Sequence, residues 1–364
     1  MTVGTLINIL PWQPGYSGFS SYVRRILPAI QGFRLQLDCN GNADIVVPGA
    51  AEPLPECLPP KVLMRLLHRY SLTQYGVNVK AALKLAALKP NYVYSPYCNW
   101  LSSLAGIPQL ITCHDLTPLY VPNSRRAWLN YRLMVPHHLH RASAVVAISK
   151  FVADQLIHIG IPATKINVIY NGIEIERPAL LAPASADLLM LARHDLNKNV
   201  AYVIKAFAAL LDRFPHWPGV LRVVGRAGRQ TTLLKKLCMS LADPNRVIFI
   251  SQVSPDQLIK LLRASLALVS SSVMEGFDYP VLEAKAEGLP TLVSTIPVHS
   301  ELHDASSLFF SLSDAGFELQ NQLLALHSDP QLWSQISLQG YKRASELSLM
   351  QQQQQLQVMM GAFR

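Results

Sequence analysis

Short apolar runs alternate with amphipathic stretches along the first half of the chain. Runs of this kind are typical of buried strands in parallel sheets, whereas the stretches between them have helical apolar spacing. The expected strands are "VGTLINIL" (3–10), "RLQLDC", "ADIVVP", "YVYSP", "PQLITCHD" and "SAVVAIS". The clearest expected helix is "NVKAALKLAALK" (78–89). Alternation of strands and helices predicts a parallel, doubly wound α/β sheet.

The same pattern begins again after residues 166–186, whose Pro, Ala and Ser content suits a linker. Helices are expected at "NVAYVIKAFAALLDRF" and "SPDQLIKLLRAS", and in the second Ser254 and Gln257 form a capping-box pattern. The expected strands are "DLLMLAR", "VLRVVG", "RVIFIS", "SLALVSS" and "PTLVST". The chain therefore reads as two Rossmann-like domains, 1–172 and 173–345, followed by a tail or helix, 346–364, that packs back on the first domain.

Composition fits this division. The chain has 364 residues, of which 50% are hydrophobic and 15% charged, enough apolar material for two cores. No apolar run reaches the roughly 18–20 residues that a membrane span needs, and the N-terminal segment reads as a buried strand rather than a signal peptide. The five cysteines are scattered and odd in number, which favours a reducing cytoplasm over a disulfide framework or a zinc site.

The positive charge is concentrated in the first half. Residues 1–172 hold 15 Lys and Arg against 6 Asp and Glu, whereas residues 173–364 hold 17 of each kind. Such an asymmetry points to an anionic partner for the first half. With no nucleic-acid-binding motif in the sequence, a membrane surface or a lipid phosphate is the expected partner. The expected location is the cytoplasm, with peripheral contact at the inner face of a membrane.

The stretch "SSVMEGFDYPVLEAKAEGLPTLVS" (271–294) carries the candidate chemistry. It predicts a strand, a turn punctuated by Gly276 and Pro280, a short helix and a second strand. Loops at the carboxyl edge of such a sheet bind ligands. The helix start at Val281 and Leu282 offers unpaired backbone N–H groups to a phosphate.

Two glutamates flank this turn. Glu283 is expected in the first helical turn, where its carboxylate can accept hydrogen bonds from a pair of sugar hydroxyls, and Glu275 can meet a second ligand group. The alternative is a surface loop with two solvated carboxylates.

At this point the sequence resembles a known family. Residues 275–283 match the E-x7-E signature of retaining glycosyltransferases of family 4, which have the GT-B fold of two Rossmann-like domains facing each other across a cleft. Other landmarks of the family occur in the expected order: "GYSGFSSYVRRIL", "LITCHDLTPLYVP", "AVVAISKFVADQL", "INVIYNGIE" and "LLMLARHDLNKNVAYVIKAF". The resemblance covers nearly the whole chain.

The resemblance implies that the C-terminal domain holds a nucleotide-sugar donor. Arg193 and Lys198 would bind the donor diphosphate and offset the charge on the leaving group. Glu283 would hold the ribose hydroxyls, and Glu275 would lie near the donor hexose. Backbone amides from Phe277 to Leu282 would contact sugar and phosphate. The sequence contains no Asp-x-Asp motif, which fits a transferase that uses neither metal nor other cofactor.

The N-terminal domain would hold the acceptor and complete the donor site. The resemblance places His114 near the donor sugar and lets Gly18 bring its backbone close to the donor phosphates or sugar. The alternative for Arg193 and Lys198 is a solvated surface pair, and the alternative for His114 is a hydrogen-bonded loop residue.

Three positions depart from the family pattern. Ala192 stands where a glycine is usual, Asp278 replaces the second glycine of "EGFG", and Tyr279 stands where an aliphatic residue is common. These changes bear on how the donor hexose is recognised. The resemblance implies front-face transfer, in which the departing phosphate oxygen takes the proton of the acceptor hydroxyl and the anomeric configuration is retained.

The expected activity is transfer of a hexose, with mannose favoured, from a GDP- or UDP-linked donor to a glycan or lipid-linked saccharide during synthesis of cell-surface polysaccharide or glycolipid. A nucleotide-sugar epimerase of the same fold and a catalytically silent GT-B subunit remain open. An NAD-dependent Rossmann enzyme would need a G-x-G-x-x-G loop, which "PGYSGFSSY" does not supply. The segment "RRAWLNYRLMVPHHLHR" (125–141) would face an anionic membrane or be an ordinary helix with one buried face. The sequence leaves the oligomeric state open.

Overall fold

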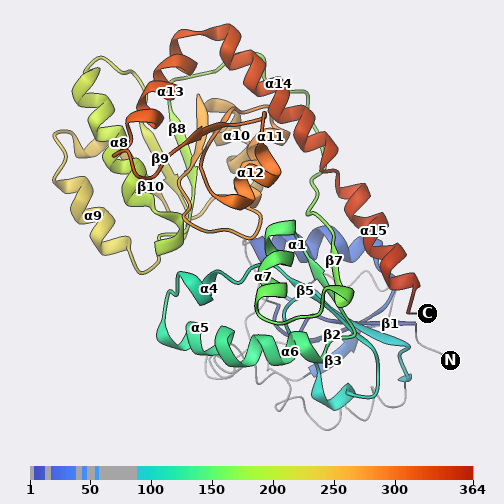
Figure 1. Ribbon diagram of the computed structural model, residues 1–364. Helices are drawn as coiled ribbons and strands as arrows, with labels where there is room; N and C mark the ends of the chain where they lie inside the picture. The colour runs from blue at the N-terminus through green and yellow to red at the C-terminus, as the bar shows by residue number, and fades with distance from the viewer. Residues whose placement is uncertain (1–3, 13–17, 38–42, 47–53, 57–87, 364) are drawn as a thin grey trace. The chain divides into compact units, whose positions relative to one another are not determined.

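The computed structural model describes residues 4–12, 18–37, 43–46, 54–56 and 88–363 (Figure 1). Two compact units are present, one made of Met1–Asn171 with Leu349–Arg364 and the other of Gly172–Ser348. Each unit is built on its own sheet and has the α/β character expected from the sequence. Most of the helix expected at 78–89 lies outside the described residues.

The sheet of the first unit has the strand order β3-β2-β1-β4-β5-β6-β7. Its strands are β1 (Thr5–Asn8), β2 (Phe33–Leu37), β3 (Ala43–Val46), β4 (Tyr92–Ser95), β5 (Gln109–Cys113), β6 (Ala144–Ala147) and β7 (Ile166–Val168). All neighbours pair in parallel except β2 and β3, which are antiparallel. The expectation of a wholly parallel sheet was wrong at this edge. Only a few residues connect β2 to β3, and this connection is too short for the crossover that parallel strands require.

The linker expected at 166–186 begins later than the sequence suggested. Residues Ile166–Val168 form β7, which pairs with β6 at the edge of the first sheet. The pattern missed this strand because it is three residues long and partly exposed, so that it lacks the apolar run of a buried strand.

Helices of the first unit follow the strands in the expected alternation. Those in the described part of the chain are α1 (Gly18–Ile26), α4 (Thr117–Tyr120), α5 (Arg125–Leu129), a π-helical turn (Asn130–Met134), α6 (Val135–Arg141), α7 (Lys150–His158) and α15 (Leu349–Gly361). The glutamine-rich tail lies in α15, where the side-chain amides of Gln353 and Gln357 donate to the carbonyls of Arg25 and Ala29.

The sheet of the second unit has the order β10-β9-β8-β11-β12-β13, with every pair parallel. Its strands are β8 (Leu188–Leu191), β9 (Leu221–Val224), β10 (Val247–Ile250), β11 (Ala267–Ser270), β12 (Thr291–Ser294) and β13 (Leu308–Phe310). This order is that of a Rossmann fold, in which the strand order reverses between β8 and β11, and ligands bind at the carboxyl ends of the strands beside that point.

Helices pack on both faces of this sheet. Leu188 and Met190 of β8 join a core with α8, α13 and α14, whereas Leu189 between them joins a second core with α10 and α11. This alternation places an apolar layer on each side of the sheet. The helices are α8 (Val200–Arg213), α9 (Thr231–Met239), α10 (Pro255–Ala264), α11 (Tyr279–Ala286), α12 (Pro297–His303), α13 (Phe317–Ser328) and α14 (Pro330–Glu346). The capping box of α10 between Ser254 and Gln257 is confirmed.

Candidate active site

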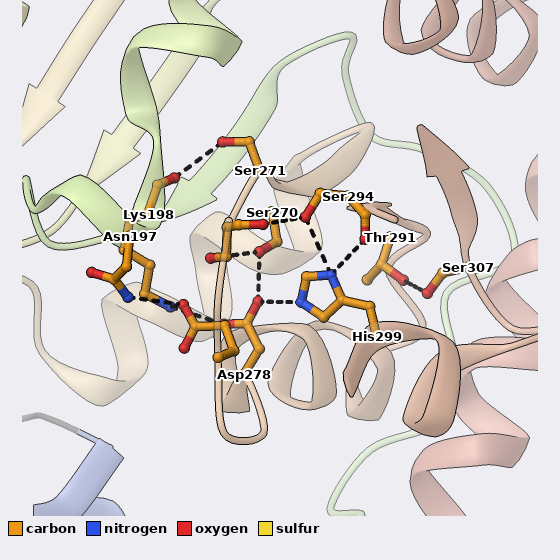
Figure 2. Close-up of polar contacts among 11 residues, drawn as sticks. Asn197, Lys198, Ser270, Ser271, Asp278, Thr291, Ser294, His299 and Ser307 are labelled. Atoms are coloured by element: carbon orange, nitrogen blue, oxygen red, sulfur yellow. Dashed lines mark hydrogen bonds and ion pairs between the residues drawn. The ribbon is translucent and has the colours of Figure 1, made fainter. Parts of the chain in front are cut away.

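The second unit gathers charged side chains where its strand order reverses. Lys198 ends the 3-10 turn Leu196–Lys198 that follows β8, while Glu275 and Asp278 follow β11, the strand next to β8. The Nζ of Lys198 lies 2.9 Å from Oε1 of Glu275 and 3.0 Å from Oδ1 of Asp278. Figure 2 shows Asn197, whose side-chain amide donates to Glu275, on the same turn as Lys198. The sheet topology therefore joins residues about 80 positions apart into one ionic group.

Asp278 is held by contacts on every side. Its backbone is in the left-handed region at φ 66°, where a residue other than glycine pays a steric cost. Its Oδ2 accepts a hydrogen bond from the hydroxyl of Ser270 at 2.5 Å and one from Nε2 of His299 at 3.1 Å (Figure 2). With Lys198 on the other oxygen, these contacts stabilise a strained turn that begins α11.

The ionic group has an outer and an inner part. The side chains of Lys198 and Glu275 keep 18% and 13% of their surface exposed, whereas those of Asp278 and His299 are 1% and 0% exposed. Lys198 and Glu275 are therefore the members that a ligand can reach, and Asp278 and His299 lie behind them.

The pKa values follow from burial and pairing. Burial would lower the pKa of Lys198, but the carboxylates of Asp278 and Glu275 hold it above its ordinary value, so the side chain is a permanent cation. Burial raises the pKa of Glu275. Burial would also raise the pKa of Asp278, but Lys198, His299 and Ser270 together hold it well below its ordinary range.

Arg193 is placed differently from Lys198. Its Nε lies 3.0 Å from Oδ2 of Asp195, and its side chain is 65% exposed. It follows β8, as the sequence suggested, but the structure does not join it to the group around Lys198. An exposed guanidinium with one carboxylate partner retains donors for an anionic ligand.

The start of α11 differs in detail from the expectation. The helix begins at Tyr279, and the backbone N–H of Val281 donates to the carbonyl of Asp278 at 3.0 Å, so the prediction of an unpaired amide at Val281 was wrong. Glu283 consequently lies in the second helical turn rather than the first. Phe277, Val281 and Leu282 have buried side chains, 2% exposed or less. Val281 and Leu282 are 0% exposed, backbone included, so no atom of either is open to a ligand in this structure, and a backbone contact at Phe277 stays a prediction.

In the first unit, His114 follows β5 and is buried against two aromatic rings. Its ring lies edge-on to Phe19 and Tyr22, with centroid distances of 4.8 and 4.5 Å. Its Nε2 is 2.8 Å from the carbonyl oxygen of Pro96, which can only accept, so Nε2 carries the proton and Nδ1 has a lone pair. Burial lowers the pKa of His114 to about 4, despite the opposing bond to Pro96. His114 is thus a neutral hydrogen-bond acceptor near neutral pH.

Gly18 is the first residue of α1, after β1. A Cβ built on Gly18 meets no described atom within 4 Å, so no contact among the described residues requires a glycine there. The remaining reason for a glycine is close approach of its backbone to a ligand, and this role of Gly18 stays a prediction.

Two family models match adjoining parts of the chain, which together span residues 40–309. The model described as Glycosyltransferase Family 4 matches residues 40–177, and the model described as Glycosyl transferases group 1 matches residues 173–309. The boundary between them falls where the two structural units meet in the sequence. The chain belongs to the GT-B glycosyltransferases.

Named relatives of this glycosyltransferase include two mannosyltransferases. The O-antigen chain mannosyltransferase RfbU of Salmonella typhimurium is 28% identical over 207 residues, which is 57% of each chain. The GDP-mannose:cellobiosyl-diphosphopolyprenol alpha-mannosyltransferase of Xanthomonas oryzae pv. oryzae is 27% identical over 272 residues, 72% of this chain and 70% of that protein. The chain spans about half the length or less of several curated relatives that it matches.

Solved structures agree on the fold. Anabaena HepE in complex with UDP and glucose superposes with a TM-score of 0.74 at 19% identity, covering 99% of this chain and 100% of that one. At this identity the likeness concerns the fold, and it confirms the GT-B architecture expected from the sequence.

The inner part of the ionic group was not predicted from the sequence of this glycosyltransferase. Asp278 stands out there only as a departure from the family's glycine, and no role is predicted for His299, Ser270 or Asn197. The sequence does contain one indication of this group. An aspartate at a turn position that favours glycine needs partners for its carboxylate. Nothing in the sequence indicates that His299, 21 positions away on α12, is one of them.

Proposed function

We propose that this glycosyltransferase moves a hexose, mannose, from a nucleotide-diphosphate sugar to a glycan or lipid-linked saccharide in the synthesis of cell-surface polysaccharide or glycolipid. Two relatives named as mannosyltransferases support mannose, and the donor named for the Xanthomonas relative supports GDP-mannose as the first donor to test. UDP, named with HepE, is the second nucleotide to test. The observation that carries the proposal is the Lys198–Glu275 pair at the ligand-binding edge of the second sheet.

In this proposal Lys198 and Arg193 bind the donor diphosphate. Lys198 is a permanent cation with part of its surface exposed, and Arg193 presents an exposed guanidinium after the same strand. Two cations offset the charge that develops on the leaving diphosphate, so the reaction proceeds without a metal. Glu283 holds the ribose hydroxyls, and Glu275 hydrogen-bonds the hexose while orienting Lys198.

We propose that transfer retains the anomeric configuration by the front-face route. The departing phosphate oxygen takes the proton of the acceptor hydroxyl, and the protein supplies orientation and electrostatic stabilisation. His114 contributes a hydrogen bond as an acceptor, since its Nδ1 has a lone pair for a sugar hydroxyl. Proton NMR of the product would give the anomeric configuration. An inverted product, or a glycosyl-enzyme trapped by Glu275→Gln and seen by mass spectrometry, would overturn this route.

The membrane-surface role is proposed from the first unit. Among the described residues no helix is long and apolar enough to cross a membrane. However, α5 and the π-helical turn after it leave Trp128 40% and Leu133 62% exposed, and Arg125, Arg126 and Arg132 beside them are exposed as well. Apolar and basic side chains exposed together favour binding to the surface of an anionic bilayer, where a lipid-linked acceptor would be found.

The test of the donor site is thermal unfolding with GDP, UDP, ADP, CMP and NAD, followed by assay of sugar transfer. A ligand at 100 times its Kd stabilises the protein by about 2.7 kcal/mol, a shift of several degrees for a chain of this size. We expect GDP, or else UDP, to raise the Tm, and the matching sugar donor to be consumed only with a glycan or polyprenyl-linked acceptor. Conversion of the donor to its epimer without acceptor would indicate an epimerase. Absence of any nucleotide effect would favour a silent subunit.

A further inference from the structure

Both ring nitrogens of His299 face hydrogen-bond acceptors. Nε2 lies 3.1 Å from Oδ2 of Asp278, and Nδ1 lies 2.9 Å from the carbonyl oxygen of Ser294 (Figure 2). A carbonyl oxygen cannot donate, and the hydroxyl of Ser294, 3.4 Å from Nδ1, donates its proton to the carbonyl of Ser272, so Nδ1 carries the proton of its bond. The oxygen of Asp278 also accepts from Ser270, and the other oxygen of that carboxylate pairs with Lys198. Nε2 therefore carries a proton too, and the arrangement is that of an imidazolium ion.

The cation balances the charges of the group. Asp278 and Glu275 supply two negative charges, and Lys198 supplies one positive charge. Without a charge on His299 the group would be net negative, an unfavourable place for a diphosphate. With the imidazolium the group is neutral, and the carboxylate of Asp278 has a counter-ion on the buried side of the group.

Other basic groups near His299 do not have this environment. Lys285 bonds the hydroxyl of Ser306 at 2.5 Å, and burial together with the charge of Arg343 lowers its pKa well below the ordinary value. His303, whose ring centroid is 6.0 Å from that of His299, has no hydrogen-bond partner among the described residues for either ring nitrogen, and burial above all lowers its pKa. His299 differs from both because it contacts a carboxylate.

We propose that His299 is a positioning residue for donor binding: its imidazolium neutralises Asp278 and so leaves the ammonium of Lys198 able to attract the diphosphate. The inference rests on the proposed function for its ligand. Asp278 is the residue that stands in place of the family's glycine, so the chain carries both the extra carboxylate and the cation that offsets it. His299 itself has no exposed surface and acts through Asp278.

The first experiment measures Kd for GDP and UDP by calorimetry in four proteins: wild type, His299→Gln, His303→Gln and the double variant Asp278→Asn/His299→Gln. Loss of one partner from a buried charge pair weakens binding at the site, so we expect Kd for the better nucleotide to rise about tenfold or more in His299→Gln. The double variant removes one charge of each sign and should recover most of that loss. His303→Gln, on the same helix α12 but with no carboxylate partner, should bind as wild type does.

These comparisons separate electrostatics from folding. If the double variant binds no better than His299→Gln, or if His299→Gln binds as tightly as wild type, the proposal is wrong. The KM for the sugar donor should follow the Kd while kcat changes less, since His299 contributes to binding of the diphosphate.

The second experiment does not depend on nucleotide binding. Nitrogen-15 NMR of histidine-labelled protein at pH 7 should show both ring nitrogens of His299 protonated, with the signal assigned by its absence from His299→Gln. A neutral His299 would overturn the inference even if the nucleotides bind. Conversely, an imidazolium signal in a protein that binds no nucleotide would leave the charge pairing intact and reject the proposed function.

Discussion

The Nζ of Lys198 lies 2.9 Å from Oε1 of Glu275, and this pair joins the turn after β8 to the loop after β11. The two residues are the exposed members of an ionic group whose inner members are Asp278 and His299. The arrangement explains why a glutamate precedes the turn: it orients a lysine that stands where the strand order of the second sheet reverses.

Replacing Lys198 should affect activity and stability together. Lys198→Ala removes the cation that is shared by two carboxylates, and we expect kcat/KM for the sugar donor to fall by about 10²–10³, as for loss of a preorganised charge at a leaving group. The unpaired carboxylates should also lower the Tm by several degrees. Steady-state kinetics and calorimetry measure both effects. Lys205→Ala, at an exposed position of α8, is the control and should change neither.

Asp278→Gly restores the residue usual in the family and should nevertheless destabilise the protein. Glycine relieves a left-handed conformation, worth roughly 1–2 kcal/mol, but the loss of one partner from a buried ion pair costs roughly 3–5 kcal/mol. Denaturant unfolding of the second unit measures the balance. Ala305→Gly is the matched control, because Ala305 has a similar φ of 55° and is exposed, so this change should stabilise. An Asp278→Gly protein that is more stable than wild type would show that the ionic contacts contribute little.

Acid should destabilise the first unit through His114. Its pKa is about 4 in the folded protein, against 6.5 as the ordinary value, so the unfolded chain binds a proton first as pH falls. The free energy of unfolding should therefore decrease between about pH 6.5 and about pH 4, by at most about 3 kcal/mol in total. Below about pH 4 the protonation of His114 should cause no further decrease.

The comparison that isolates this effect is the pH dependence of unfolding in His114→Gln, whose amide can keep the bond to Pro96. In this variant the free energy of unfolding should decrease less over the same pH range, and the difference from wild type should be at most about 3 kcal/mol. A residual slope is expected from His138, because burial and the charge of His137 lower its pKa to about 4 as well. His158→Gln, at an exposed position of α7, should leave the wild-type profile unchanged.

Gly18→Ala separates folding from function in the first unit. A Cβ at this position meets nothing within 4 Å, and alanine favours helices more than glycine, so the Tm should stay the same or rise. If the backbone at Gly18 approaches the donor, kcat/KM should fall about tenfold or more, because small displacements of a reacting group are costly. Gly106→Ala, where a Cβ also meets nothing within 4 Å, should keep both values. If Gly18→Ala turned over the donor at the wild-type rate, Gly18 would not be part of the donor site.

Binding to anionic vesicles should depend on the exposed surface of α5 and the turn after it. Flotation with phosphatidylserine vesicles should recover less of a Trp128→Ala/Leu133→Ser protein than of wild type, and Arg125→Ser/Arg126→Ser should lose about 1 kcal/mol of binding per charge. Neutral vesicles should bind little of any variant. Leu338→Ser, at a position 49% exposed in the second unit, is the control. Equal recovery on neutral and anionic vesicles would argue against a membrane role.

Much of the fold was determined by local patterning in the sequence. The apolar runs around Leu189 and Leu268 predicted buried parallel strands, since strands covered on both faces are apolar throughout. The same patterning did not reveal β13 (Leu308–Phe310) or the antiparallel pairing of β3, because a three-residue strand carries little signal and pairing direction depends on the connection. The sequence also predicted that Lys198 and Glu275 follow the ends of strands, because both residues lie in motifs that resemble those of the family.

Only the tertiary structure decided which of these residues meet. Lys198 and Asp278 are 80 positions apart and become partners because β8 and β11 are neighbours in the sheet, and His299 joins them because α12 follows the next strand, β12. Tertiary contacts also decide which acceptors the ring of His299 meets, the carboxylate of Asp278 at Nε2 and the carbonyl of Ser294 at Nδ1. Local sequence determines elements through patterns a few residues long, whereas an ionic group depends on contacts that form only when the sheet has brought distant strands together.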